Sequence, residues 1–271
     1  MNYRMVFNIT GKVLRIEAVL MLLPALVSVL YKEWLPAISF GATSAIVFVL
    51  GLLLVKLIKP KNSFLFAKEG LVSVAVAWMA VSAFGAVPFV ICGDIPSYVD
   101  ALFETVSGFT TTGASILADV ESLSRGALFW RSFTHWIGGM GILVFVLATS
   151  AKTTDRSMHI LRAEMPGPIV DKFVPKARNT TIILYLIYTV LTVILIGLLM
   201  LGGMPFFDSV IHAFGTAGTG GFGMYNDSLA SASPYIQWVI TIFMLIFGVN
   251  FNLYFLILIG KLGSFFTNTK L

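Results

Sequence analysis

Long apolar runs, separated by short polar segments, dominate the chain. The runs are 19 to 25 residues long. A helix of 19 residues is about 28 Å long, which nearly matches the hydrocarbon core of a bilayer. We therefore expect six membrane-spanning helices: Val13–Tyr31, Leu35–Ile58, Leu71–Cys92, Leu128–Ser150, Thr181–Leu201 and Tyr235–Ile259.

A different pattern follows the third apolar run. A short amphipathic stretch at 97–108 leads into the small, hydroxyl-rich segment Ser107-Gly-Phe-Thr-Thr-Thr-Gly-Ala-Ser115. Twelve helical residues reach only about 18 Å, too short to cross a membrane. The pattern predicts a re-entrant helix followed by a loop at membrane depth, where irregular backbone must be buried or line a wet cavity. A helix lying on the outer surface is the alternative.

The same unit occurs twice. Asp100 to Glu104 precedes the first loop, and Asp208 to His212 precedes a second, degenerate loop. Without gaps, Asp100 aligns with Asp208 and Gly113 with Gly221, both at an offset of 108 residues. Repetition at a fixed spacing indicates architecture.

The two loops have the composition of an ion selectivity filter. Threonines followed by a glycine can stack backbone carbonyls around a dehydrated cation, and no fixed charge is needed among them. We predict that the carbonyls of eight residues form filter strands: Thr110, Thr111, Thr112 and Gly113 in the first, and Gly218, Thr219, Gly220 and Gly221 in the second. Simple turn glycines are the alternative.

Charged and titratable residues near the loops are candidates for supporting roles. Asp100 and Asp208 stand at the starts of the short helices, where a carboxylate can cap free N–H groups and complement the helix dipole. A share in attracting cations is their alternative role. Glu104 and His212 occupy equivalent positions, where either a pore function or structural pairing is open. For His135, in the fourth run, packing is favoured.

Composition supports a membrane protein. The chain is 58% hydrophobic and 11% charged, with a mean hydropathy of +0.92, whereas soluble domains are about 25% charged. The single cysteine, Cys92, rules out an intrachain disulfide, and no cleavable signal peptide is expected.

The charge distribution predicts the orientation. The net charge of +5 could suggest nucleic acid, but fifteen of the eighteen Lys and Arg fall on the side of the N-terminus. By the positive-inside rule both termini are expected in the cytoplasm, with both loops entering from outside. No nucleic-acid partner is expected, and membrane lipid is.

An enzymatic alternative has little support. Ser107 and His135 could suggest an intramembrane serine protease, but the usual Gly-x-Ser-Gly is absent and the second loop copy would have no role. The sequence has no metal-ligand cluster or nucleotide-binding fingerprint, so we expect neither an enzyme nor a cofactor.

Four segments carry a family resemblance. The run Asp-Ala-Leu-Phe-Glu-Thr-Val-Ser-Gly-Phe-Thr-Thr-Thr-Gly-Ala (100–114) and His-Trp-Ile-Gly-Gly-Met-Gly-Ile (135–142) resemble the Trk/Ktr/HKT superfamily of potassium transporters, most closely its bacterial TrkH branch. Gly-Gly-Phe (220–222) and Asn-Phe-Asn-Leu-Tyr-Phe (250–255) are similar to the second repeat of that branch.

The resemblance implies an all-α polytopic protein with half of a four-repeat pore. Two leading helices (1–64) would precede a first helix–pore loop–helix repeat (65–152), and a cytoplasmic loop with a second repeat would follow (153–271). The family's gating loop and blocking arginine belong to a third repeat, which is not in this sequence.

The resemblance also implies a function and partners. The function is K⁺ uptake across the bacterial plasma membrane, with K⁺ as substrate at the filter residues. A homodimer or the missing second half, and a cytosolic nucleotide-binding regulatory subunit, are the implied partners. A non-conducting, truncated membrane protein that only packs with a partner is the alternative.

Overall fold

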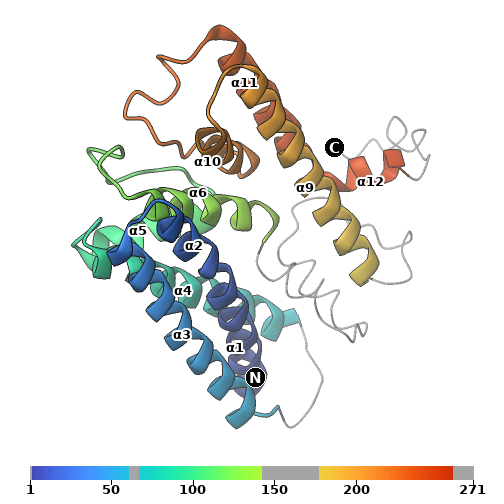
Figure 1. Cartoon of the computed structure of the whole chain (residues 1–271). Helices are drawn as coiled ribbons and strands as arrows, with labels where there is room; N and C mark the ends of the chain where they lie inside the picture. The colour runs from blue at the N-terminus through green and yellow to red at the C-terminus, as the bar shows by residue number, and fades with distance from the viewer. Residues whose placement is uncertain (1, 61–66, 142–176, 259–271) are drawn as a thin grey trace.

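The computed structural model describes residues 2–60, 67–141 and 177–258, and within these ranges all regular structure is helical. Figure 1 shows the helices in two groups, one formed by the first half of the chain and the other by α9 to α12. Their bounds are α1 (Tyr3–Leu20), α2 (Leu22–Leu30), α3 (Trp34–Leu57), α4 (Ala67–Cys92), α5 (Tyr98–Phe109), α6 (Arg125–Met140), α9 (Ala177–Leu201), α10 (Phe206–Ala217), α11 (Pro234–Gly248) and α12 (Phe251–Leu258).

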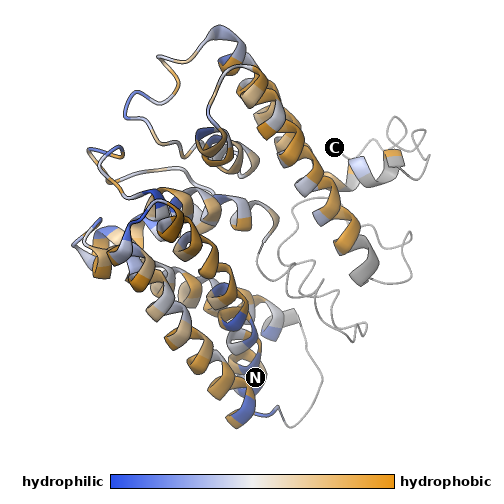
Figure 2. Cartoon of the chain, viewed as in Figure 1, coloured by the Kyte–Doolittle hydropathy of each residue, from blue (hydrophilic) through white to orange (hydrophobic). Residues whose placement is uncertain are grey.

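Four helical segments within these ranges are long and apolar enough to cross a membrane: Tyr3–Leu30, Trp34–Leu57, Glu69–Cys92 and Thr181–Leu201. Their outward faces carry large apolar side chains, among them Leu57, Met79 and Leu201, which are 73–81% exposed. Figure 2 shows apolar residues along these helices and hydrophilic residues in the connecting loops. This is the surface expected of helices that face lipid.

The first span begins ten residues earlier than the expected Val13. Helix α1 starts at Tyr3, and a break at Met21 separates it from α2, where Pro24 lacks the N–H that would continue the hydrogen-bond ladder. Polar residues hid this first part from a hydropathy argument. One of them, Asn8, is buried and donates to two backbone carbonyls at the end of α3.

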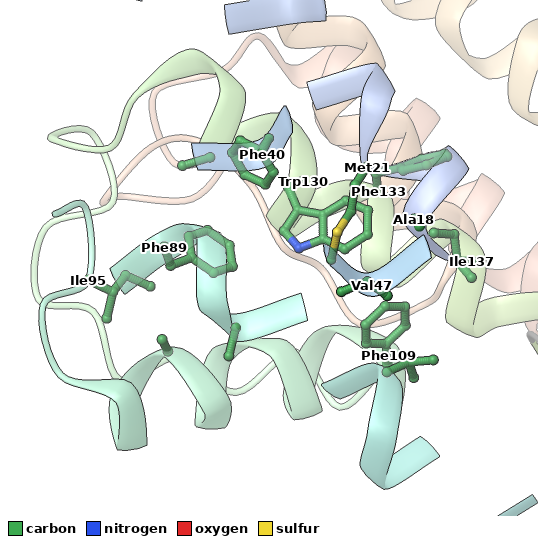
Figure 3. Close-up of a cluster of buried hydrophobic side chains, with 14 of the residues drawn as sticks. Ala18, Met21, Phe40, Val47, Phe89, Ile95, Phe109, Trp130, Phe133 and Ile137 are labelled. Carbon is green, nitrogen blue, oxygen red and sulfur yellow. The ribbon is translucent and has the colours of Figure 1, made fainter. Parts of the chain in front are cut away.

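The main core lies where α1, α3 and α4 meet α5 and α6 (Figure 3). Trp130 is fully buried there, and its indole N–H donates to the Gly85 carbonyl at 2.9 Å. The rings of Phe40 and Phe109 pack edge-on against it at 6.2 and 6.0 Å. These contacts fix α6 against the first group of helices.

The two short helices have identical lengths. Helices α5 and α10 each have 12 residues, and their first and last residues are related by the same offset of 108. Each buries most of one face, including Glu104 in α5 and His212 in α10. They are therefore packed inside the protein, which contradicts the surface-helix alternative.

The fourth and sixth spans differ from the expectation. Helix α6 ends at Met140, where Gly141 adopts φ 73°, and residues 142–150 lie outside the described residues. The expected last span is interrupted: α11 ends at Gly248, and Val249 is extended. The hydroxyl of Tyr254 donates to the Ile246 carbonyl at 2.7 Å and so satisfies a group at this break.

The expected cytoplasmic loop at 151–180 falls mostly on residues 151–176, which lie outside the described residues, as does the end of the chain from 259. A second core of α9, α10 and α11 contains Tyr188, Ala213 and Ile240. Trp136 of α6 packs against both cores, so α6 is the helix that joins the two repeats.

Candidate functional site

Two short backbone segments with the same conformation follow α5 and α10. Along 110–113 the φ angle is −84° at Thr110, 54° at Thr111 and 76° at Gly113. The equivalent residues of 218–221 have φ −75° at Gly218, 57° at Thr219 and 83° at Gly221. A positive φ is a genuine outlier for a β-branched threonine, so both segments store strain at the same position.

This alternation matters for the carbonyl groups. In an ordinary strand, successive carbonyls point to opposite sides; alternating signs of φ turn them toward the same side. The N–H groups of Thr111 and Thr219 bond back to the preceding helices, to Gly108 and Thr216. Within the described parts of the chain, no group donates a hydrogen bond to the carbonyls of 110–113 or 218–221. These oxygens are therefore available to a ligand.

The two segments lie side by side. A Cβ placed on Gly113 would overlap the carbonyl of Gly220, and one placed on Gly220 would come within 2.8 Å of the Thr111 carbonyl. Gly221 differs, because a Cβ there would meet nothing within 4 Å. Gly113 and Gly220 are therefore the positions at which the two segments require close approach.

Helix α6 supports both segments from behind. A Cβ on Gly138 would overlap the Phe109 carbonyl, and one on Gly139 would lie 3.2 Å from the Cα of Gly218. One turn earlier, the imidazole of His135 packs against Gly220. The run 135–142 therefore has a physical role: its small residues admit the backbone of both segments.

The candidate capping residues do not cap. Ser97 is the N-cap of α5 and accepts from the Asp100 N–H, so the carboxylate of Asp100 lies inside the first turn. The N-cap of α10 is Pro205, without a side-chain bond. The capping prediction is wrong for both aspartates, although a first-turn carboxylate still complements the helix dipole.

Asp208 has a different partner. Its carboxylate accepts a 2.6 Å hydrogen bond from the Tyr225 hydroxyl, in the loop beyond the second segment. This bond, with partial burial, raises the pKa of Tyr225 to about 12. Asp208 therefore holds the outgoing loop against the helix that precedes it.

Glu104 and His212 are equivalent in sequence but make different contacts. Glu104 accepts hydrogen bonds from Ser115, Ile116 and Arg131. The ring of His212 stacks on Tyr225 at 5.7 Å, and its Nε2 has no hydrogen-bond partner among the described residues. Both residues hold the chain that leaves a segment, which supports the structural side of the prediction.

The serine protease arrangement is not formed. The Ser107 hydroxyl donates to the Ala114 carbonyl at 2.6 Å, and neither ring nitrogen of His135 has a hydrogen-bond partner among the described residues. His135 is fully buried against Phe222, with ring centroids 4.0 Å apart. Its environment is that of a packing residue, as favoured from the sequence.

Sequence reasoning missed two functional candidates. Arg131 was treated only as one of three basic residues on the outer side, yet an arginine within an apolar run is itself a signal. Asn226 links the two outer loops: its side chain accepts from Val120 N–H at 2.7 Å and donates to Asp119 at 2.8 Å. No pattern in the sequence indicated that contact, because the partners are more than 100 residues apart.

Comparison with known proteins gave consistent matches. A family model described as TrkH, cation transport protein, matches residues 38–269. The Trk system potassium uptake protein TrkH of Salmonella typhimurium is 36% identical over 96% of this chain and 54% of the relative. Its Escherichia coli K12 counterpart is 35% identical with the same coverage.

A solved structure agrees with these relatives. The crystal structure of the potassium transporter TrkH from Vibrio parahaemolyticus superposes with a TM-score of 0.78 at 30% identity. The match covers 94% of this chain and 52% of that one. The chain thus spans about half the length of the relatives it matches.

Proposed function

Since the chain belongs to the TrkH family of cation transport proteins, we propose that it forms half of a K⁺ uptake pathway. Segments 110–113 and 218–221 would be two of its filter strands, and their carbonyls would replace part of the water shell of K⁺. The observation that carries this proposal is the matching alternation of φ in two adjacent segments related by 108 residues. A turn glycine alone would not require a strained threonine at the same position in both copies.

The helix dipoles favour a cation at this place. Helices α5 and α10 end at Phe109 and Ala217, immediately before the two filter strands. The C-terminal end of a helix carries a partial negative charge of about half an elementary charge. Two such ends attract a cation without placing a carboxylate in its path.

We assign the chain three units: leading helices (1–64), a first repeat (65–152), and a loop with a second repeat (153–271). The identical bounds of α5 and α10 support the repeat, and the contacts of α1 and α3 with α4 and α6 support a scaffold role for the leading helices. Glu33, in the turn before α3, accepts from the N–H groups of Arg125 and Gly126 and so holds the start of α6.

We also place both termini in the cytoplasm of a bacterial cell. Glu33, Asp94 and Asp119 lie at the helix ends and loops associated with the two filter strands. Figure 1 shows the N-terminus at the other end of the first helix group. A phosphatase fused after Leu271 should be inactive in intact cells; strong periplasmic activity would contradict this orientation.

Two strands can surround only part of an ion path, so a conducting pore needs two more. A chain supplying the remaining half, or a second copy of this one, would provide them, and surrounding lipid would cover the apolar faces. A cytosolic nucleotide-binding subunit is a further partner, as the family resemblance implies. The alternative, a non-conducting protein that only packs with a partner, predicts no flux in any assembly.

Liposome flux distinguishes these cases. The chain is reconstituted alone over a range of densities, and together with the second half of the Salmonella relative. We expect monomers to show no selective K⁺ flux, because exposed filter backbone would face hydrocarbon at a cost of several kcal/mol per group. Selective flux should appear with the second half, or with the square of density if two copies pair. Absence of flux in every assembly would contradict the proposed function.

A further inference from the structure

We infer that Arg131 and Glu104, both in the first repeat, position the filter strand of the second repeat as well as that of the first. One buried ion pair would then set the relative placement of the two strands. This inference rests on the proposed function for the word filter, but the contacts that carry it are independent of ion flow.

Glu104 fixes the exit of the first strand. One carboxylate oxygen accepts from the Ser115 hydroxyl and the Ile116 N–H, both at 2.6 Å. The other accepts from Arg131 Nε at 2.9 Å. Three donors on one carboxyl group suit its ionised form, which can only accept.

Arg131 carries the connection to the second strand. Its Nη1 donates to the Gly223 carbonyl at 3.0 Å, and its guanidinium carbon lies 3.6 Å from the ring centre of Phe222. The other contact of that ring is His135, one turn along α6. Phe222 and Gly223 directly follow Gly221, so Arg131 holds the exit of the second strand.

The second repeat has no equivalent of this pair. His212 stands where Glu104 stands in the first repeat, and at the same offset Val239 stands in place of Arg131. The aliphatic residue cannot donate to a strand exit. The second strand therefore obtains from α6 a contact that its own repeat does not provide.

Burial makes the pair sensitive to the loss of either member. The side chains of Arg131 and Glu104 are 3% and 0% exposed. Removing one partner leaves an uncompensated buried charge, which is far more damaging than never having had the pair. The planar guanidinium also reaches two acceptors at once, which a lysine ammonium on a flexible stem does not reproduce.

Hydrogen–deuterium exchange of the purified chain in lipid nanodiscs tests the inference. The Gly221 N–H, which bonds to the Gly215 carbonyl, reports on the second strand. The Ile116 N–H reports on the first. In Arg131→Gln we expect exchange across 219–224 to rise about tenfold or more, the scale of a lost charged hydrogen bond.

Three variants serve as comparisons. Glu104→Gln should raise exchange at Ile116 and across 219–224. Arg131→Lys keeps a charge for Glu104 but loses the fork, so it should protect Ile116 and still expose 219–224. Arg125→Gln removes another α6 arginine, whose guanidinium packs on Tyr31 and Phe207, and should leave both reporters unchanged.

The outcomes separate the inference from the proposed function. Unchanged exchange across 219–224 in Arg131→Gln, or an equal rise in α3 and α9, would overturn the positioning role. In an assembly that conducts, Arg131→Gln should also lower the K⁺ to Na⁺ permeability ratio while Arg125→Gln does not. An unmodified assembly without K⁺ flux would refute the proposed function, whereas the exchange data would still decide the inference.

Discussion

Replacing Gly113 by alanine should disturb the filter strands more than the same change at Gly221. Both residues have a positive φ, 76° and 83°, so both variants should lose about 1–2 kcal/mol to the left-handed conformation. Only at Gly113 would the new Cβ overlap a neighbour, the carbonyl of Gly220. Overpacking adds roughly 1–3 kcal/mol. The expected losses are therefore about 2–5 kcal/mol for Gly113→Ala and about 1–2 kcal/mol for Gly221→Ala.

Two measurements check this difference. Denaturant unfolding of the purified chain should show a lower free energy of unfolding for Gly113→Ala than for Gly221→Ala. In a conducting assembly, Gly113→Ala and Gly113→Asp should reduce K⁺ over Na⁺ selectivity, because the Gly220 carbonyl must move. Equal stability of the two alanine variants would refute the close approach of the strands, and unchanged selectivity in both Gly113 variants would remove the filter assignment.

Three further predictions concern the surroundings of the strands. Tyr225 has a pKa of about 12 against an ordinary 10.0, so its hydroxyl bond to Asp208 stabilises the fold below pH 10.0 and that stability is lost as the pH rises toward 12; Tyr225→Phe should abolish this loss in thermal scans between these pH values. Trp130→Phe leaves the Gly85 carbonyl without its donor and should lower the free energy of unfolding by about 1–3 kcal/mol, with a normal value contradicting the role of that bond. Asn226→Ala removes the side-chain link between the outer loops and should speed deuterium exchange at the Val120 amide; unchanged exchange would mean that the loops are held by other contacts.

Periodicity and length were enough to predict most of the helical framework. The span Thr181–Leu201 has the bounds expected from hydropathy, and the short helix expected at 97–108 is α5 at Tyr98–Phe109. The offset of 108 residues also predicted the equivalence of the two strands. These features depend on local sequence, since a helix in lipid must satisfy its own backbone.

Features that depend on packing between distant segments could not be predicted in the same way. The break at Val249 has no proline or glycine at that residue to mark it, and the hydroxyl of Tyr254 makes it tolerable. Thr111 and Thr219 adopt a conformation that their side chains disfavour, so residue type argues against it. Arg131 acquires its role only when α6 packs between α5 and the second strand.

The most direct test of the account is to locate the ion. The assembly that conducts would be crystallised or frozen in Rb⁺ or Tl⁺, and the density of the heavy cation mapped against segments 110–113 and 218–221. We expect cation density within about 3 Å of the carbonyls of both segments, since these oxygens replace the water shell. A conducting, K⁺-selective assembly whose cation density lies away from both segments would contradict the central claim.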